Sequence, residues 1–251
     1  MRDIVYPPVI VTAKVLFKAL GLRFQLSGTE HIPREGGALL SINHVGYIDF
    51  VLAGFAAQPV HRLVRFMAKR EAFDHRVSGP IMRSMHHISV DRADGIGSFK
   101  EAVRYLKDGE LVGIFPEATI SRSFEIKEIK SGAVRIAAAA GVPVIPVVLW
   151  GTQRLMTKDH DKDFSRGKAI TIALGPPVAL TGDAVADTAT LRVAMSGLLD
   201  QAIRTYPQHE PGAWWLPASY GGSAPTLEEA ARIDAEEKAA RAARKAAREG
   251  A

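Results

Sequence analysis

The chain has 251 residues, of which 47% are hydrophobic, so it can form one large domain with an extensive core. Its formal net charge of +5 is compatible with anionic partners such as a phosphorylated substrate, a membrane surface or nucleic acid. It contains no cysteine, which excludes disulfide bonds, thiolate metal sites and any cysteine-linked intermediate.

The first predicted element is a helix that begins near Pro7-Pro8 and ends at Gly21, because proline fits the first turn of a helix. Lys14 and Lys18 fall on one narrow stripe of this helix, and most other positions are apolar. Such a helix is either buried with two solvated lysines or lies in a membrane interface, with the lysines near anionic headgroups. No apolar run is long enough for a transmembrane helix, and the lysines interrupt the region that a secretory signal would need.

The middle of the chain alternates between predicted strands and helices, which favours an α/β sheet covered on both faces. Runs of apolar residues bounded by glycine, proline or charged residues define these elements. The predicted strands are 23–27, 38–42, 65–69, 87–90, 111–115, 144–149 and 168–174, and the predicted helices are 50–57, 73–85 with an interruption near Gly79-Pro80, 98–107, 132–140 and 188–203.

The end of the chain differs in composition from the rest. Trp214 and Trp215 either mark a membrane interface or pin a terminal segment to the core. Residues 226–251 consist largely of Ala, Glu, Lys and Arg, which predicts a solvated helix or a partly disordered tail. We therefore expect a membrane-interface helix over 1–24, an α/β domain over 25–220 and a charged tail over 221–251.

Two His/Asp pairs have a spacing of five residues, and strand geometry distinguishes them. His86 and Asp91 flank a predicted strand, in which five residues span about 16 Å and the two side chains point to opposite faces. His44 and Asp49 lie on either side of a predicted strand-to-helix turn, so Asp49 can fold back onto His44. An aspartate on one ring nitrogen fixes the tautomer and leaves the other nitrogen as a base. The alternative for His44 alone is a structural loop histidine.

Three further motifs follow predicted strands or form one. Asp91-Arg92 ends a strand, where the arginine could bind a phosphate or form a local ion pair. Residues 115–122 offer a carboxylate, two hydroxyls and a cation, and Lys130 precedes a helix N-terminus, which favours anions. An ordinary polar loop with helix caps is the alternative. The proline-flanked strand over 141–146 is apolar and is expected in the core, although it could line an acyl chain.

Together these motifs resemble the glycerolipid acyltransferases related to 1-acylglycerol-3-phosphate acyltransferase. The four family blocks occur in order from about residue 38 to 152, nearly half of the chain. Lys69, between the first two blocks, and Lys130-Ser-Gly-Ala, after the third, also match the family pattern. The four blocks are Asn43-His44 through Asp49, Ile88 through Arg92, Phe115 through Ser121, and Val142 through Val147.

The resemblance implies a mixed, mostly parallel sheet flanked by helices, and acyl transfer from acyl-CoA or acyl carrier protein to a hydroxyl of 1-acylglycerol 3-phosphate. His44 would be the general base and Asp49 would orient it, with direct transfer and without a metal or other cofactor. The implied location is the cytoplasmic face of the cell membrane, without a transmembrane span. The candidate phosphate ligands are Lys69, Arg92, Arg122 and Lys130, with Glu117 and Thr119 shaping the acceptor site and Glu117 ordering the basic residues.

The third block departs from the family pattern at two positions. Ala118 stands where the family has glycine, and Ile120 stands where it has an arginine that is taken to bind the acceptor phosphate. Arg122, two residues further on, keeps the positive charge, and we expect it to substitute.

Other functions remain open on the sequence alone. The same chemistry on glycerol 3-phosphate or another lysolipid is the nearest alternative. A non-catalytic lipid- or phosphate-binding protein is the alternative from another class, and the intact His44/Asp49 pair argues against it. Nucleic-acid binding is disfavoured because aromatic residues do not alternate with the basic ones.

Overall fold

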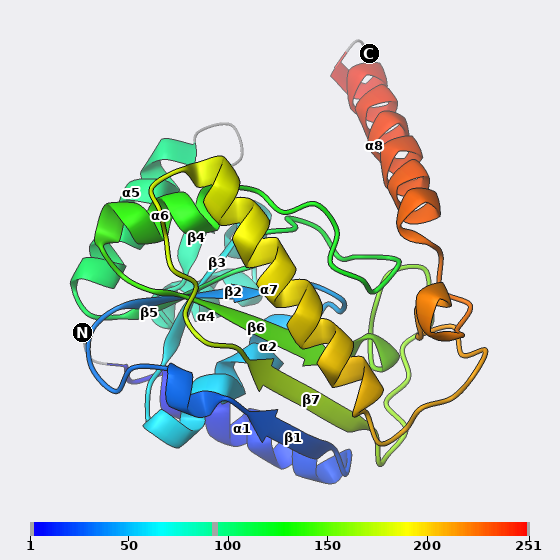
Figure 1. Ribbon diagram of the computed structural model, residues 1–251. Coiled ribbons are helices and arrows are strands. Elements are labelled where there is room, and N and C mark those ends of the chain that lie inside the picture. Colours follow the sequence, from blue (N-terminus) through cyan, green and yellow to red (C-terminus); the bar gives the residue numbers. More distant parts are fainter. Residues whose placement is uncertain (1–2, 92–94, 250–251) are drawn as a thin grey trace.

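The computed structural model describes residues 3–91 and 95–249, which form a sheet of seven strands with helices on both faces (Figure 1). The strand order is β1-β7-β6-β2-β5-β3-β4. All neighbouring strands pair in parallel except β6 and β7, which pair antiparallel, so β1 and β7 run against the other five. The strands are β1 Arg23–Ser27, β2 Ala38–Ile42, β3 Val64–Lys69, β4 Ile88–Val90, β5 Leu111–Ile114, β6 Val144–Trp150 and β7 Ala169–Leu174.

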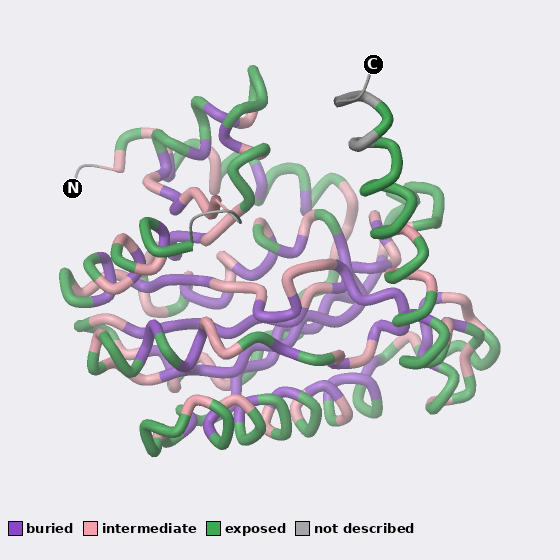
Figure 2. Tube along the Cα trace, turned by 90° about the horizontal axis from the view of Figure 1, so that it is seen from above, coloured by how far each residue is buried: buried purple, intermediate pink, exposed green. Residues whose placement is uncertain are grey.

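The sheet separates two apolar cores, and the central strand β2 contributes to both. Leu40 and Ile42 pack on one face, and Leu39 packs on the other, as the two-residue period of a strand requires. Figure 2 shows the buried central strands in purple. The helices are α1 Tyr6–Ala19, α2 Asp49–Ala53, α3 Arg70–Asp74, α4 Ser78–Ser84, α5 Gly95–Lys107, α6 Gly132–Ala140, α7 Ala184–Arg204 and α8 Leu227–Glu249, with 3₁₀ segments η1 Thr29–His31, η2 Gly54–Val60, η3 Thr152–Arg154 and η4 Ala218–Tyr220.

Helices α5, α6 and α7 cover one face of the sheet, and α1, α2 and η2 cover the other. Helix α1 buries Tyr6, Ala13 and Phe17 against the core, while most of its other residues are exposed. In the part of the chain that the structure describes, no helix combines the length and apolarity needed to cross a bilayer.

The predicted α/β fold is confirmed, the interruption of one predicted helix is displaced, and the structure favours one of the two alternatives for Trp215. The interruption in the helix predicted over 73–85 lies between Asp74 and Ser78, and not at Pro80. Pro80 occupies the first turn of α4, where a backbone N–H has no partner within the helix, so its missing N–H costs no hydrogen bond. Trp215 is buried and packs edge-on against Trp150 and Tyr206, so it pins the terminal segment to the core.

The five strands that run in the same direction end at one edge of the sheet. The loops after β2, β5 and β6 carry His44, Glu117 and Thr152. β3 ends at Lys69, and Asp91 directly follows β4. The carboxyl ends of parallel strands are where α/β proteins bind ligands. The topology alone therefore brings the sequence motifs to one side of the molecule.

Replacing glycine by alanine should change the free energy of unfolding in opposite directions at Gly113 and Gly197. A Cβ on Gly113 of β5 would lie 2.7 Å from Cδ1 of Phe66 and 3.0 Å from Cγ1 of Val64. We expect Gly113→Ala to lower the free energy of unfolding by about 1–3 kcal/mol through overpacking. Gly197→Ala in the exposed middle of α7 meets no atom within 4 Å and should raise that free energy by about 0.5–1 kcal/mol. Urea unfolding followed by circular dichroism measures both, and a neutral Gly113→Ala would contradict the close packing.

Candidate active site

The loop that follows β2 begins with an asparagine that extends the sheet. The side-chain nitrogen of Asn43 donates to the Leu149 carbonyl at 3.0 Å, and its oxygen accepts from the Leu149 N–H at 2.7 Å. The amide thus forms the two hydrogen bonds that a peptide group would form with β6. Asn43 is fully buried, so these bonds also satisfy its polar atoms. These two bonds hold the backbone in place at the residue that precedes His44.

The Asp49 carboxylate is completely buried and accepts four hydrogen bonds. Its Oδ2 lies 2.7 Å from the Val45 N–H, 2.8 Å from the Gly46 N–H and 3.0 Å from His44 Nδ1. Its Oδ1 accepts from the Thr152 hydroxyl at 2.6 Å. Every partner is a donor, which suits an ionised carboxylate that can only accept. The aspartate therefore closes the turn and holds the imidazole together.

This arrangement fixes the chemistry of His44. With Nδ1 donating to Asp49, the neutral ring carries its free electron pair on Nε2, where it can accept a proton. The side chain is 23% exposed, so the ring is accessible from the loop edge. One side of the ring packs on Phe115, with the ring centroids 4.5 Å apart. The other His/Asp pair does not provide such an arrangement, since Asp91 pairs with Arg70 at 2.9 Å.

The loop after β5 holds the backbone of His44 from both sides. Glu117 Oε1 accepts from the His44 N–H at 3.0 Å, and the Ser121 N–H donates to the His44 carbonyl at 2.7 Å. Burial raises the pKa of Glu117 to about 7, although the His44 N–H and the charge of Lys127 oppose the shift. Its Oε2 is buried without a hydrogen-bond partner. Glu117 thus orders the backbone that carries His44, whereas its predicted partners were basic side chains.

Two neighbours of Glu117 show how the loop turns. Ala118 has a φ of +62°, the left-handed region that glycine adopts most easily, so the loop keeps a glycine-like conformation without glycine. Thr119 accepts a hydrogen bond from Lys127, which also approaches the Ile120 carbonyl at 3.5 Å. Ile120 itself is buried. Lys127 therefore places an ammonium group beside the position where the resemblance leads one to expect an arginine.

Arg122 lies in an environment that the sequence does not reveal. Its three guanidinium nitrogens donate to carboxylates of Asp159, Asp234 and Glu237. Because these partners hold it, its pKa is raised and the pKa of Glu237 is lowered to about 2. Carboxylates occupy the guanidinium in this structure, and two of them belong to α8. The binding of Arg122 to a substrate phosphate stays a prediction.

Two of the remaining predicted ligands lie along the same edge. Lys69 ends β3 and is exposed, and Lys130 is exposed just before α6. Arg92 lies outside the described residues. The roles of these three cations stay predictions. Within residues 3–91 and 95–249, no three His, Asp or Glu side chains gather to hold a metal ion.

Residues that follow β6 also belong to the site, although no sequence motif indicated them. Thr152 binds Asp49, and the Thr157 hydroxyl donates to the Val45 carbonyl at 2.7 Å. The Tyr47 N–H donates to the Met156 carbonyl at 2.9 Å. The sequence offered one indication of this role. Gly151-Thr152 follows β6, which pairs with β2, the strand that precedes His44.

The raised pKa of Glu117 predicts a specific pH dependence of stability. The folded-state pKa of about 7 lies above the ordinary value of 4.5, so ionisation disfavours the folded state as the pH rises between these values. We expect the free energy of unfolding of the wild type to fall, relative to Glu117→Gln, by up to about 3 kcal/mol from pH 4.5 to 7.5.

Urea unfolding of both proteins across this range measures the difference. Buried His87, with a pKa lowered to about 4, contributes the opposite slope, but equally in both proteins. A difference that does not change with pH would show that the Glu117 carboxyl titrates normally.

Comparison with known proteins agrees with this site. Residues 23–150, about half of the chain, match the family model described as Acyltransferase. A 1-acyl-sn-glycerol-3-phosphate acyltransferase of Bacillus subtilis is 30% identical over 176 residues, which cover 70% of this chain and 83% of that protein. One from Limnanthes douglasii is 31% identical over 162 residues, which cover 63% of this chain and 55% of the plant protein.

A solved structure supports the fold. The crystal structure of the 1-acyl-sn-glycerophosphate acyltransferase PlsC from Thermotoga maritima superposes with a TM-score of 0.65, at 23% identity and with 81% of each chain covered. The His44–Asp49 turn and the loop that holds it lie inside the matched region. From the family match and the relatives, this chain belongs to the acyltransferase family that includes the 1-acyl-sn-glycerol-3-phosphate acyltransferases.

Proposed function

We propose that this protein transfers a fatty acyl group from a thioester, acyl-CoA or acyl carrier protein, to the free hydroxyl of 1-acylglycerol 3-phosphate. The product would be phosphatidic acid, a precursor of phospholipids. The observation that carries the proposal is the His44 ring, held by a buried and fully bonded Asp49 and exposed at the sheet edge. The names of the relatives support the choice of acceptor.

The reaction follows from the free electron pair on His44 Nε2. This nitrogen takes the proton of the acceptor hydroxyl while the hydroxyl oxygen attacks the thioester carbonyl carbon. The tetrahedral intermediate then collapses, the C–S bond breaks, and the thiolate takes the proton back from the imidazolium. Asp49 stabilises the imidazolium and keeps the ring oriented. The chain has no cysteine, and the proposed transfer is direct, without an acyl-enzyme.

An apolar cavity beside the base suits the acyl chain. It has a volume of about 250 Å³ and lies between α1, α2 with η2, β3 and α4. Phe66 lines it and stacks at 6.3 Å on Phe115, which in turn packs on His44. Apolar side chains dominate its wall, as in other sites for apolar ligands. We place the donor acyl chain there, with its thioester end toward His44.

The acceptor is the less constrained part of the proposal. We keep Lys69, Arg92, Arg122, Lys130 and Thr119 as candidate residues of the acceptor site. Glycerol 3-phosphate or another lysolipid is the second candidate acceptor, favoured by Ile120 in place of the expected arginine. A purely lipid-binding function would leave the bonding of Asp49 to His44 without a purpose.

The deciding experiment measures thiol release from palmitoyl-CoA in the presence of lysophosphatidate. His44→Ala should lower the rate by about 10²–10⁴-fold, because general-base catalysis contributes that much. The matched control is His209→Ala, an exposed histidine after α7, which should retain the wild-type rate. Equal rates in wild type and His44→Ala would refute the catalytic proposal, and glycerol 3-phosphate run in parallel identifies the preferred acceptor.

We also propose that α1 attaches the protein to the cytoplasmic face of the cell membrane, where the acceptor lipid would be found. Val11, Val15 and Leu16 are 54–64% exposed, and Lys14 and Lys18 are exposed on the same helix. Apolar side chains that enter the interface and lysines that reach anionic headgroups both favour such binding.

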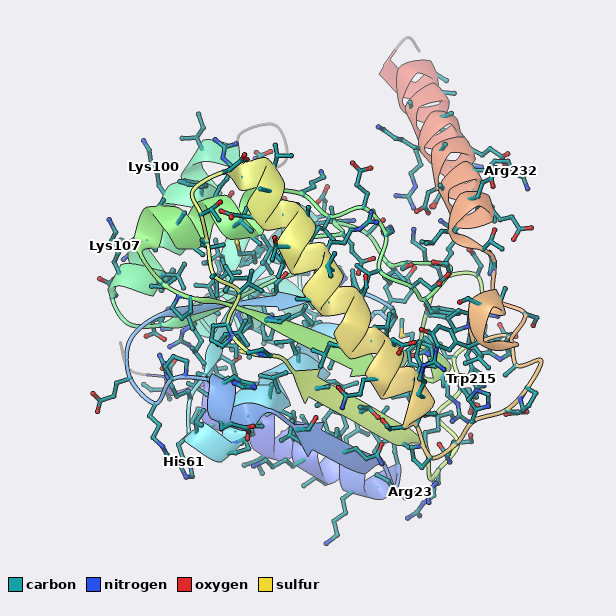
Figure 3. The ribbon with its side chains drawn as sticks, in the orientation of Figure 1. Arg23, His61, Lys100, Lys107, Trp215 and Arg232 are labelled. Atoms are coloured by element: carbon teal, nitrogen blue, oxygen red, sulfur yellow. The ribbon has the colours of Figure 1, made fainter. Side chains whose placement is uncertain are left out.

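Binding to vesicles tests the attachment. With vesicles containing phosphatidylserine, Lys14→Glu/Lys18→Glu should bind at least about tenfold more weakly, since each basic residue near an anionic surface contributes about 1 kcal/mol. The control Lys100→Glu/Lys107→Glu changes the charge equally on α5, where both lysines project outward (Figure 3). Equal weakening in both variants would indicate a general charge effect and contradict attachment through α1.

A further inference from the structure

Three cations meet beside the loop that holds His44. Arg122 and Lys127 come from the loop after β5, and Lys158 comes from the loop after β6. Their side chains are 7%, 21% and 14% exposed, so they form a partly buried group, which we call the cation cluster. Arg122 directly follows Ser121, whose N–H donates to the His44 carbonyl. The cluster is thus attached to the backbone that carries the base.

Two carboxylates of α8 occupy the cation cluster. Asp234 accepts from Arg122 and lies 3.3 Å from Lys127 and 3.5 Å from Lys158. Glu237 lies 2.9 Å from Arg122 and 3.5 Å from Lys158. The two residues are three positions apart and therefore share one face of the helix. They come more than a hundred residues after the loop that they bind, so the contact joins distant parts of the chain.

The α8 carboxylates present the charge pattern of a phosphomonoester. Asp234 and Glu237 supply two negative charges, and three of their oxygens accept from the cluster: Oδ1 and Oδ2 of Asp234 and Oε2 of Glu237. A phosphomonoester carries nearly the same charge and also has three strong acceptor oxygens. A group of cations that holds one of these arrangements is suited to hold the other.

Helix α8 has little else to hold it in place. Among its residues whose burial the structure describes, Ala230 alone is buried. Figure 1 shows α8 extending away from the sheet and its covering helices, and Arg232 projects from it into solvent (Figure 3). Asp234 and Glu237 are still 26% and 31% exposed, so a ligand in solution can reach their ion pairs. A ligand that binds the same cations can therefore replace the two carboxylates and release the helix.

We propose that the cation cluster is a binding site for a substrate phosphomonoester and that Asp234 and Glu237 occupy it until the substrate displaces them. Helix α8 is then an internal competitor of the substrate. The inference rests on the proposed acyl transfer and adds Lys127 and Lys158 to the binding residues. Two substrates carry a phosphomonoester, the lysophosphatidate acceptor and the 3′-phosphate of the CoA donor.

The test uses Asp234→Asn/Glu237→Gln, which removes both charges without changing the size of the side chains. We expect the KM for one phosphomonoester substrate to fall by about 5- to 30-fold, because a competing contact is lost. The control is Glu228→Gln/Glu236→Gln, which removes two charges from the same helix at exposed positions, Glu236 pairing with Arg232. The control should leave both KM values within about twofold of the wild type.

The arms of the experiment separate the two sources of phosphate. A lower KM for lysophosphatidate, with no change for monoacylglycerol, assigns the site to the acceptor. A lower KM for palmitoyl-CoA, with no change for its 3′-dephospho analogue, assigns it to the donor. Unchanged KM values for both phosphorylated substrates, or equal decreases in the control, would overturn the proposal.

A second measurement does not depend on transfer activity. Inorganic phosphate at constant ionic strength should raise the melting temperature of Asp234→Asn/Glu237→Gln more than that of the wild type, and Lys127→Met/Lys158→Met should abolish this difference when added. If acyl transfer is absent but the phosphate effect is present, the proposed function fails and the site stands. If transfer is present and phosphate has the same effect on all variants, the site fails alone.

Discussion

The structure of the site depends on the buried carboxylate of Asp49. Within one side chain it joins the end of β2, the beginning of α2 and the segment after β6, through four donors that leave neither oxygen unpaired. A buried charge is tolerated only when its partners are complete, so loss of any donor would leave an uncompensated charge in the core. The same bonds that keep the carboxylate stable therefore fix the tautomer and direction of the His44 ring. The hydrogen bonds of Asp49 therefore contribute both to the stability of the turn and to the orientation of His44.

The direction of the strands determines which loops lie near the Asp49 carboxylate. Because β2, β3, β4, β5 and β6 run the same way, their following loops meet at one edge, and each adds a different group. β7 and β1 run the other way and contribute no loop to that edge directly after their last residues. They extend the sheet and carry part of the core against which α1 packs, on the side where the apolar cavity lies. The sheet thus has a polar edge that holds His44 and an apolar face that carries a cavity.

The parts of the site that are formed by residues close together in the sequence could be predicted from the sequence. The His44–Asp49 contact follows from a strand, a turn and a helix start within a few residues. The segment 141–146 was expected in the core, and it is buried from Val144 onward. The partners of Arg122 could not be read in this way, because Asp234 and Glu237 come from a charged helix that sequence patterns assign to solvent. The role of Glu117 was also hidden, since its partner is a backbone N–H and not a cation. The interruption after Asp74 was misplaced because Pro80 suits a helix start as well as a break.

The missing side chain at Gly113 has a consequence for the cavity. The Phe66 ring occupies the space above β5 that any larger residue would fill, and from there it forms one wall of the apolar cavity and stacks on Phe115. Phe115 in turn covers one side of His44. The cavity and His44 are therefore separated by aromatic rings, and the absence of a side chain at Gly113 leaves room for the first of them. In the proposed complex, the sheet would thus set how far the acyl chain lies from His44.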